Sequence, residues 1–296
     1  MIDIELECLE EFTFIGYPNR DPCDINMSGC KNLKVFELKR HRMIAKEWLQ
    51  PLLHNFQLLQ SLVLHDCPLY GRIRISGHHL RCVEISSSNG NLGEYPIVNA
   101  PNLELFSYAG DINSFLYSME TSHIQIANFK LYFNHLNTRK FFQLKELLAN
   151  YSQAQFINLH INPNMVKFQQ KDMTSTPICG VRLTIDPTMK LEGRTVEFSI
   201  DYQALVDGLL WSIQPEILSL KLDCKPNIQF LEVLCRKLGS MRQESCCKST
   251  GPRCWVHHLR HVKIVWGENT TCDSTEILKL LPAFRPFHII SFQFKW

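Results

Sequence analysis

Short runs in which apolar and polar residues alternate recur along the first half of the chain at nearly constant spacing. The clearest run places apolar residues and a cysteine in the pattern L-x-x-L-x-L-x-x-N/C-x-L, at Leu59, Leu62, Leu64, Cys67 and Leu69. The same apolar spacing begins again at Leu9, Leu33, Leu80, Leu103 and Ile126. Successive starts fall 21 to 26 residues apart, so the pattern predicts repeated units that each contain one short strand.

This period is typical of leucine-rich repeats, which are roughly 20 to 29 residues long. After residue 150 the pattern continues less regularly, with starts at Phe156, Ile217 and Leu259. Because alternate residues of a strand face opposite sides, the fixed apolar residues are expected to point inward and the intervening residues to form a concave face. The pattern therefore predicts an α/β leucine-rich-repeat solenoid, or horseshoe, of about nine or ten repeats with parallel strands.

The repeats are expected to form one domain over residues 1–296, regular over 1–165 and irregular, with insertions, over 166–296. Strands are also predicted over 181–185 and 196–200, as an irregular repeat or an inserted hairpin. Helical spacing of apolar residues predicts helices over 46–56, 139–152, 227–241 and 273–281, the last capped by Asp273 or Ser274. Cys67, Asn134 and Asn164 are expected where the chain turns after a strand.

Three passages resemble the plant F-box/leucine-rich-repeat proteins. Residues 59–69 look like that family's cysteine-bearing repeat, and residues 100–110, A-P-N-L-E-L-F-S-Y-A-G, are similar to its A-P-N-L-x-x-F-x-Y-x-G segment. The third passage, after Cys246 and Cys247, is C-W-V-H-H-L-R-H-V-K-I over 254–264, which looks like the family's late C-W-x-H-x-L-x-x-V-K-I strand. The resemblance extends over most of the chain between residues 33 and 265.

In that family an N-terminal F-box docks on the Skp1 subunit of a cullin-based ubiquitin ligase, and the repeats hold the substrate. The resemblance implies that this chain is the substrate-recognition part of such an adaptor. No Leu-Pro-rich F-box precedes the first repeat, so a Skp1-type partner is expected only if an F-box lies upstream. The alternative is a stand-alone interaction scaffold, or a truncated relic, without ligase association.

The residues expected to contact a protein partner occupy the intervening, outward positions of the predicted strands. They form a strip of mixed charge made of Glu37, Lys39, His65, Glu84, Lys130, Tyr132, His160, Lys221 and Asp223, with His261 and Lys263 further along. Tyr132 is the strongest single candidate, because interface tyrosines combine a large apolar area with a hydroxyl group. The charged neighbours are expected to set orientation and specificity more than affinity.

Composition and charge exclude several other partners and compartments. The formal net charge is only +2 and the basic residues are scattered, so neither nucleic acid nor a membrane surface is an expected partner. No secretory signal or long apolar span is found, and the 12 cysteines are irregularly spaced, so reduced thiols and a nuclear or cytoplasmic, intracellular location are expected. Glycosylation acceptors at Asn26, Asn150 and Asn269 raise the alternative of an extracellular receptor, which the missing signal disfavours.

Nothing in the sequence predicts an enzyme or a cofactor. Phosphate-binding glycine motifs, H-E-x-x-H and G-x-S-x-G are all absent. One cluster contains possible zinc ligands, Cys246, Cys247, Cys254, His257, His258 and His261. Its thiols are adjacent rather than paired as C-x2-4-C, so a cysteine-rich loop before a strand is the preferred interpretation and no metal site is predicted.

Overall fold

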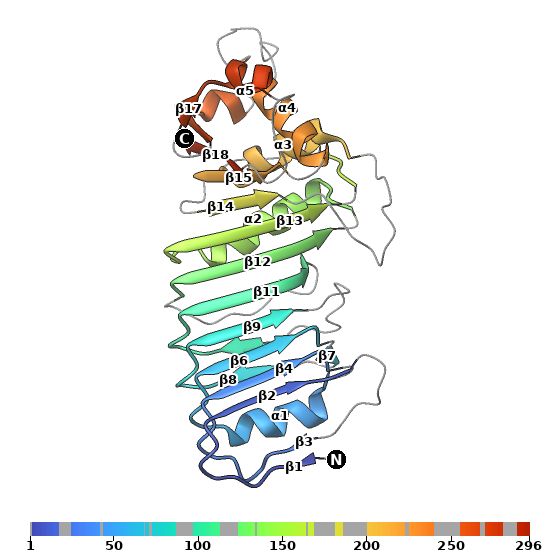
Figure 1. Ribbon diagram of the computed structural model, residues 1–296, viewed down its shortest axis with the longest axis vertical. Coiled ribbons are helices and arrows are strands. Elements are labelled where there is room, and N and C mark those ends of the chain that lie inside the picture. The colour runs from blue at the N-terminus through green and yellow to red at the C-terminus, as the bar shows by residue number, and fades with distance from the viewer. Residues whose placement is uncertain are drawn as a thin grey trace. The chain divides into compact units, whose positions relative to one another are not determined.

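The chain is a mixed α/β protein with a large, mostly parallel sheet and few helices (Figure 1). The computed structural model describes residues 2–17, 25–41, 44–67, 69–70, 73–86, 97–112, 124–133, 135–163, 165–168, 181–185, 200–222, 225–239, 255–266, 270–280 and 289–296. It contains two compact units, each described by itself below. Unit 1 comprises Met1–Tyr132 with Gln153–Phe156, and unit 2 comprises Phe133–Ser152 with Ile157–Trp296.

The strands of unit 1 follow one another in the sheet in the same order as in the sequence, and all neighbours are parallel. They are β2 (Glu11–Ile15), β4 (Val35–Lys39), β6 (Ser61–His65), β9 (Cys82–Ser86), β11 (Leu105–Asp111) and β12 (Ile126–Phe133). Each contains the two apolar residues that follow the start of one predicted repeat, which confirms the predicted strands. Parallel neighbours require a return connection after every strand, and this explains the regular spacing along the chain.

Outside the large sheet, unit 1 contains a second set of short parallel pairs and one helix. The pairs are β1 (Ile2–Asp3) with β3 (Ile25–Asn26), β5 (Ile44–Ala45) with β7 (Leu69–Tyr70), and β8 (Arg74–Ser76) with β10 (Ile97–Asn99). Helix α1 (Lys46–Asn55) lies among them, because Trp48 Nε1 donates to the Ile25 carbonyl at 3.0 Å and Gln50 exchanges two hydrogen bonds with the Arg74 backbone.

The inward face of the unit 1 sheet is a continuous apolar core. Ladder register aligns Phe36, Leu62, Val83, Phe106 and Ala127, all with no measurable exposure. The next inward row holds Leu38, Leu64, Ile85, Tyr108 and Phe129, also buried. Because no single repeat could enclose these side chains, each strand is stabilised by burial against its neighbours.

Cys67 is the second residue after β6, at the turn where it was expected. Its Sγ donates to the carbonyls of Leu38 at 3.4 Å and His65 at 3.3 Å, so the thiol links the C-terminal ends of the neighbouring strands β4 and β6. The side chain is fully buried, and this burial raises the pKa of the Cys67 thiol to about 11. The buried neutral thiol is therefore part of the core and is chemically protected.

Iodoacetamide at pH 8 is expected to alkylate the exposed Cys8 in the native chain while leaving Cys67 unmodified, because only the thiolate attacks and Cys67 is both buried and protonated. Peptide mass spectrometry of timed samples measures both sites. Urea-unfolded chain, in which both sites should react, is the control. Equal native rates at Cys8 and Cys67 would contradict the buried position.

The same pKa predicts an effect of alkaline pH on stability. Below pH 9.0 the Cys67 thiol is protonated in both the folded and the unfolded chain. As pH rises from 9.0 to about 11, the thiol of the unfolded chain ionises first. The contribution of Cys67 to the free energy of unfolding therefore decreases by up to about 3 kcal/mol over that interval. A Cys67→Ala variant is expected to lose unfolding free energy less steeply than the wild type between these pH values.

Unit 2 combines parallel and antiparallel strands with most of the helices. Strands β13 (Phe156–Pro163), β14 (Val181–Ile185) and β15 (Ile217–Lys221) are parallel. The last strand, β18 (Ile289–Lys295), lies between β15 and β16 (His261–Trp266) and is antiparallel to both, and β17 (Thr270–Cys272) is antiparallel to β16. The helical elements are α2 (Thr138–Asn150), α3 (Tyr202–Ser212), α4 (Lys225–Gly239), α5 (Ser274–Leu280) and the 3₁₀ helix η4 (Trp255–His258).

Three helices of unit 2 begin at residues that cap their first turn. Asn137 accepts a hydrogen bond from the Lys140 amide, and Asp201 accepts one from the Ala204 amide. Asp273 accepts from the amide of Glu276 at 2.8 Å, and Glu276 accepts from the Asp273 amide at 2.9 Å, which is a reciprocal capping box. The predicted cap at Asp273 and the four predicted helices are confirmed as α1, α2, α4 and α5.

Two features of unit 2 differ from the sequence-based predictions. Helix α3 was not predicted, because it is buried on nearly every side and lacks an amphipathic pattern. The expectation of parallel strands is wrong at the C-terminal end, where β16, β17 and β18 pair antiparallel. Residues 196–199, Asn134 and Asn164 lie outside the described residues.

The register of the later strands also differs from the prediction. Phe106 pairs with Ala127 and Tyr108 with Phe129, so the repeat after Leu103 begins at Ile124 and not at Ile126. Strand β12 has eight residues, whereas β9 has five. The longer strand buries an additional apolar residue, so the repeat pattern can also be matched two residues later in the sequence. Ile217 is displaced in the same way: its neighbour Leu218 is buried, and Ile217 faces outward.

Candidate partner-binding surface

The face of the unit 1 sheet opposite to the core consists of aligned rows of half-buried and exposed side chains, here called the outward face. One row holds Thr13, Glu37, Val63, Glu84, Ser107 and Asn128. The next row holds Ile15, Lys39, His65, Ser86, Ala109 and Lys130. Six of the predicted contact residues, Glu37, Lys39, His65, Glu84, Lys130 and Tyr132, lie on this face, as their alternation with buried neighbours predicted.

Charged groups at the β2 end of the outward face are linked to one another. Glu37 accepts from Lys39 in a 2.8 Å ion pair and from Thr13 Oγ1 at 3.1 Å. The hydrogen bond from Lys39 is the main reason why the pKa of the Glu37 carboxyl lies below its ordinary value. These contacts hold the side chains in position on a sheet surface, and such positioning favours specific recognition.

At the other end of unit 1, Tyr132 provides the largest aromatic group of the outward face. The Lys130 ammonium lies 5.8 Å from the centre of the Tyr132 ring, a cation–π arrangement on alternate residues of β12. Tyr132 is half-buried and Lys130 is exposed, so both residues remain partly accessible to a partner. This pair has the features of an interface anchor.

A serine, a histidine and an aspartate meet where β6 and β9 end. Ser86 Oγ is 2.7 Å from His65 Nδ1, whereas the nearest Asp66 oxygen is 3.7 Å from His65 Nε2, too long for a hydrogen bond. Ser86 Oγ also accepts a hydrogen bond from the backbone amide of Asp66, a residue with a positive φ of 54°. His65 is 55% exposed, so the group lacks the buried, oriented base of a nucleophilic triad and serves as a polar turn.

The remaining predicted contact residues belong to unit 2. His160 of β13 pairs with Thr184 of β14 and is only half-exposed. Lys221 is the last residue of β15, and Asp223 lies outside the described residues. His261 and Lys263 are exposed on β16, where they alternate with Val262 and Ile264 as predicted.

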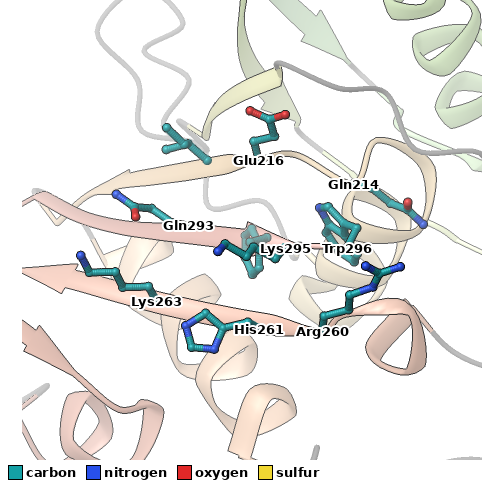
Figure 2. A pocket seen from close by; sticks show the side chains of 10 residues that line it. Gln214, Glu216, Arg260, His261, Lys263, Gln293, Lys295 and Trp296 are labelled. Atoms are coloured by element: carbon teal, nitrogen blue, oxygen red, sulfur yellow. The ribbon is translucent and has the colours of Figure 1, made fainter.

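An open hollow of about 900 Å³ lies on unit 2 over strands β15, β18 and β16 (Figure 2). It is here called the C-terminal hollow, and it is lined by Gln214, Glu216, Ile217, Arg260, His261, Lys263, Gln293, Phe294, Lys295 and Trp296. Figure 2 shows Glu216 on one side, Lys263, His261 and Arg260 along the other, and Gln293 and Lys295 on the strand between them. The hollow therefore has an anionic edge and a cationic edge.

The apolar floor of this hollow is held in place by several contacts. Trp296 Nε1 donates to the Pro215 carbonyl at 2.9 Å, and its ring lies 5.6 Å from that of Phe294. The Phe294 amide donates to the Glu216 carbonyl and the Arg260 amide donates to the Lys295 carbonyl, each at 2.8 Å. These bonds fix the three strand ends that carry the lining side chains.

Sequence reasoning identified only His261 and Lys263 among the lining residues. The alternation in β18 does signal that Gln293 and Lys295 share a face, since Phe292 and Phe294 are buried. Nothing in the sequence signals that β18 inserts between β15 and β16. The hollow is therefore a product of a long-range, antiparallel strand pairing.

Neither metal binding nor membrane crossing is indicated by the described residues. In that part of the chain, no group of three or more His, Cys, Asp or Glu side chains is arranged to hold a metal, and the cysteines Cys8, Cys30, Cys67, Cys82, Cys235 and Cys272 are free thiols. The possible zinc ligands Cys246, Cys247 and Cys254 lie outside the described residues. None of the described helices has the length and apolar character required to cross a bilayer.

Comparisons of the chain with protein-family models, with curated proteins and with solved structures find no match. The function is therefore inferred from the residues of the chain and their geometry.

Proposed function

We propose that this chain is a protein-recognition module of the leucine-rich-repeat type that binds a protein partner on the outward face of its strands. The observation that carries the proposal is the regular arrangement of the outward face, where polar, charged and aromatic side chains occupy successive ladder positions. A sheet backed by a buried core presents such side chains in fixed positions, which lowers the entropic cost of ordering them on binding.

Within this proposal, Tyr132 and Lys130 serve as the anchor and the linked Glu37 and Lys39 provide orientation. The anchor buries aromatic area against the partner, whereas the ion pair contributes mainly to selectivity. Extended binding along a row of strands suits a partner surface that is itself a folded protein or a long segment.

We further propose, on the resemblance to plant F-box/leucine-rich-repeat proteins, that this recognition selects a substrate for a Skp1–cullin ubiquitin ligase. The chain would then contribute binding alone, raising the local concentration of the substrate near the transferring subunits. A Skp1 contact would require an F-box associated with the chain.

Site-specific photocrosslinking tests the recognition surface. A photoreactive phenylalanine analogue at position 132 is expected to capture the same partner from plant extract in repeated experiments. The analogue at exposed Glu47, on helix α1 of the same unit, is the matched control and should not capture it. Capture of the same proteins at both positions, or at neither, would contradict binding on the outward face.

The captured protein then tests the ligase proposal. It should become ubiquitylated in a reconstituted Skp1–cullin reaction when the chain is joined to an F-box, and not when Tyr132→Ala and Lys130→Ala are introduced together. Selective capture without ubiquitylation would instead identify a stand-alone scaffold.

A further inference from the structure

The C-terminal hollow carries an excess of positive charge. Of its described side chains, Arg260, Lys263 and Lys295 are cationic, and Glu216 is the only carboxylate. His261 lies directly opposite Lys295 across the β16–β18 ladder, and Lys263 lies opposite Gln293. Lys263 and Lys295 are therefore diagonal neighbours on this ladder, where like charges repel each other.

These cations are not neutralised within the part of the chain that the structure describes. The ammonium groups of Lys263 and Lys295 and the guanidinium of Arg260 have no hydrogen-bond or ion-pair partner there. Elsewhere the same structure does pair its charges, as in the contacts of Lys39 with Glu37 and of Arg81 with Glu104. The hollow is thus electrostatically complementary to an anionic ligand.

We infer that the C-terminal hollow binds an acidic segment of a protein partner, with its carboxylates against Arg260, Lys263 and Lys295 and an apolar side chain on Ile217 and Trp296. The inference rests on the proposed function, since it names the chemistry of the partner. The hollow spans three strands and its volume of about 900 Å³ accommodates several residues of an extended peptide.

The charge distribution favours an acidic peptide over a nucleic acid. A nucleic-acid surface needs a basic stripe that follows many phosphates, whereas the whole chain has a formal net charge of only +2. Glu216 also faces the cations across the hollow and would repel a continuous phosphate backbone. A peptide avoids this repulsion by placing an amide or a basic group beside Glu216.

The apolar floor supplies the second element of specificity. Ile217 faces outward and is half-buried, and Trp296 is half-buried and held by its bond to Pro215 and by ring contacts with Phe294 and Trp255. An acidic segment with a leucine or similar residue between its carboxylates would bury that residue here while keeping its charges near the cationic edge. A purely polar acidic segment would leave the apolar surface of Ile217 and Trp296 exposed to solvent.

Fluorescence polarisation with the purified full chain tests the inference. The probe is a fluorescein-labelled peptide with two acidic residues on each side of a central leucine. We expect binding that weakens as salt rises, at least tenfold weaker binding of the matched glutamine and asparagine peptide, and about threefold weaker binding when the leucine is serine.

Charge-reversal variants locate the binding. Lys263→Glu with Lys295→Glu should weaken the probe at least tenfold, and Glu216→Gln should strengthen it about twofold. Lys279→Glu, at an exposed position of α5, reverses one charge outside the hollow and should change binding less than twofold. Because all of these positions are exposed, the variants should keep the wild-type melting temperature.

Equal weakening by Lys279→Glu, or equal binding of the neutral peptide, would overturn the inference. Binding of a single-stranded oligonucleotide or of inorganic phosphate as tight as that of the acidic peptide would also overturn it, since the hollow would then be a general anion site. If the peptide fails to bind while capture at position 132 stays selective, only this inference fails. If both fail, the proposed function fails with it.

Discussion

Replacing Gly208 by alanine is expected to lower the free energy of unfolding by about 3 kcal/mol, although alanine is the better helix former. A Cβ atom at position 208 would lie 2.3 Å from Phe141 Cζ and within 2.8 Å of two further ring atoms. Phe141 is fully buried on α2, so its ring has no free space to enter. The overlap therefore outweighs the gain in helix propensity of about 1 kcal/mol.

Urea denaturation of the variant measures this loss, and a second substitution identifies its cause. Phe141→Leu shortens the side chain that meets position 208, so Gly208→Ala should cost at least 1 kcal/mol less in that background. Additive losses from the two substitutions would show that the packing of α2 against α3 is not the reason for the glycine. Ser212, whose Oγ donates to the Gly208 carbonyl, stays unchanged in both variants.

Replacing Asp207 by alanine is expected to cost about 3 kcal/mol, because this carboxylate connects three helices of unit 2. Asp207 Oδ1 accepts from Lys237 Nζ of α4 at 2.5 Å and from Trp255 Nε1 of η4 at 2.8 Å, and Oδ2 accepts from Gln203 at 2.9 Å. The side chains of Asp207 and Lys237 are 27% and 25% exposed. Alanine would leave a half-buried ammonium and a buried indole N–H without this acceptor.

Two variants separate these contributions in thermal or urea unfolding. Asp207→Asn keeps an acceptor for Trp255 but removes the charge, so it should cost less than half as much as alanine. Glu232→Ala breaks the exposed pair with Arg236 on α4 and is expected to cost under 1 kcal/mol, since solvent screens that pair. A loss at Asp207→Ala as small as that at Glu232→Ala would contradict the linking role.

The strands of unit 1 could be predicted from the sequence because each repeat contains its own run of alternating apolar and polar residues. Phe36 and Leu38, or Leu62 and Leu64, alternate with polar residues in a run short enough to be one strand, and the period places the next run beside it. The outward positions of Glu37, Lys39, His65 and Glu84 follow from the same alternation. Local patterns decide these features, and the fold preserves them.

The later register could not be predicted from the same pattern. In β12 and β15 the apolar residues fit the repeat in two frames, and only pairing with the neighbouring strand selects one of them. That choice makes Ile217 outward rather than inward, and so places it in the C-terminal hollow.

The sequence by itself determined the repeated strands, most of the helices, the cap at Asp273 and the outward residues of unit 1, since each depends on neighbours within a few positions. Only the tertiary structure decided the place of β18 between β15 and β16, the contact of Gly208 with Phe141, and the three hydrogen bonds of Asp207. Ser219 and Ser291 meet at 3.1 Å although 72 residues separate them. Contacts of this kind depend on how whole elements pack, and no local periodicity encodes them.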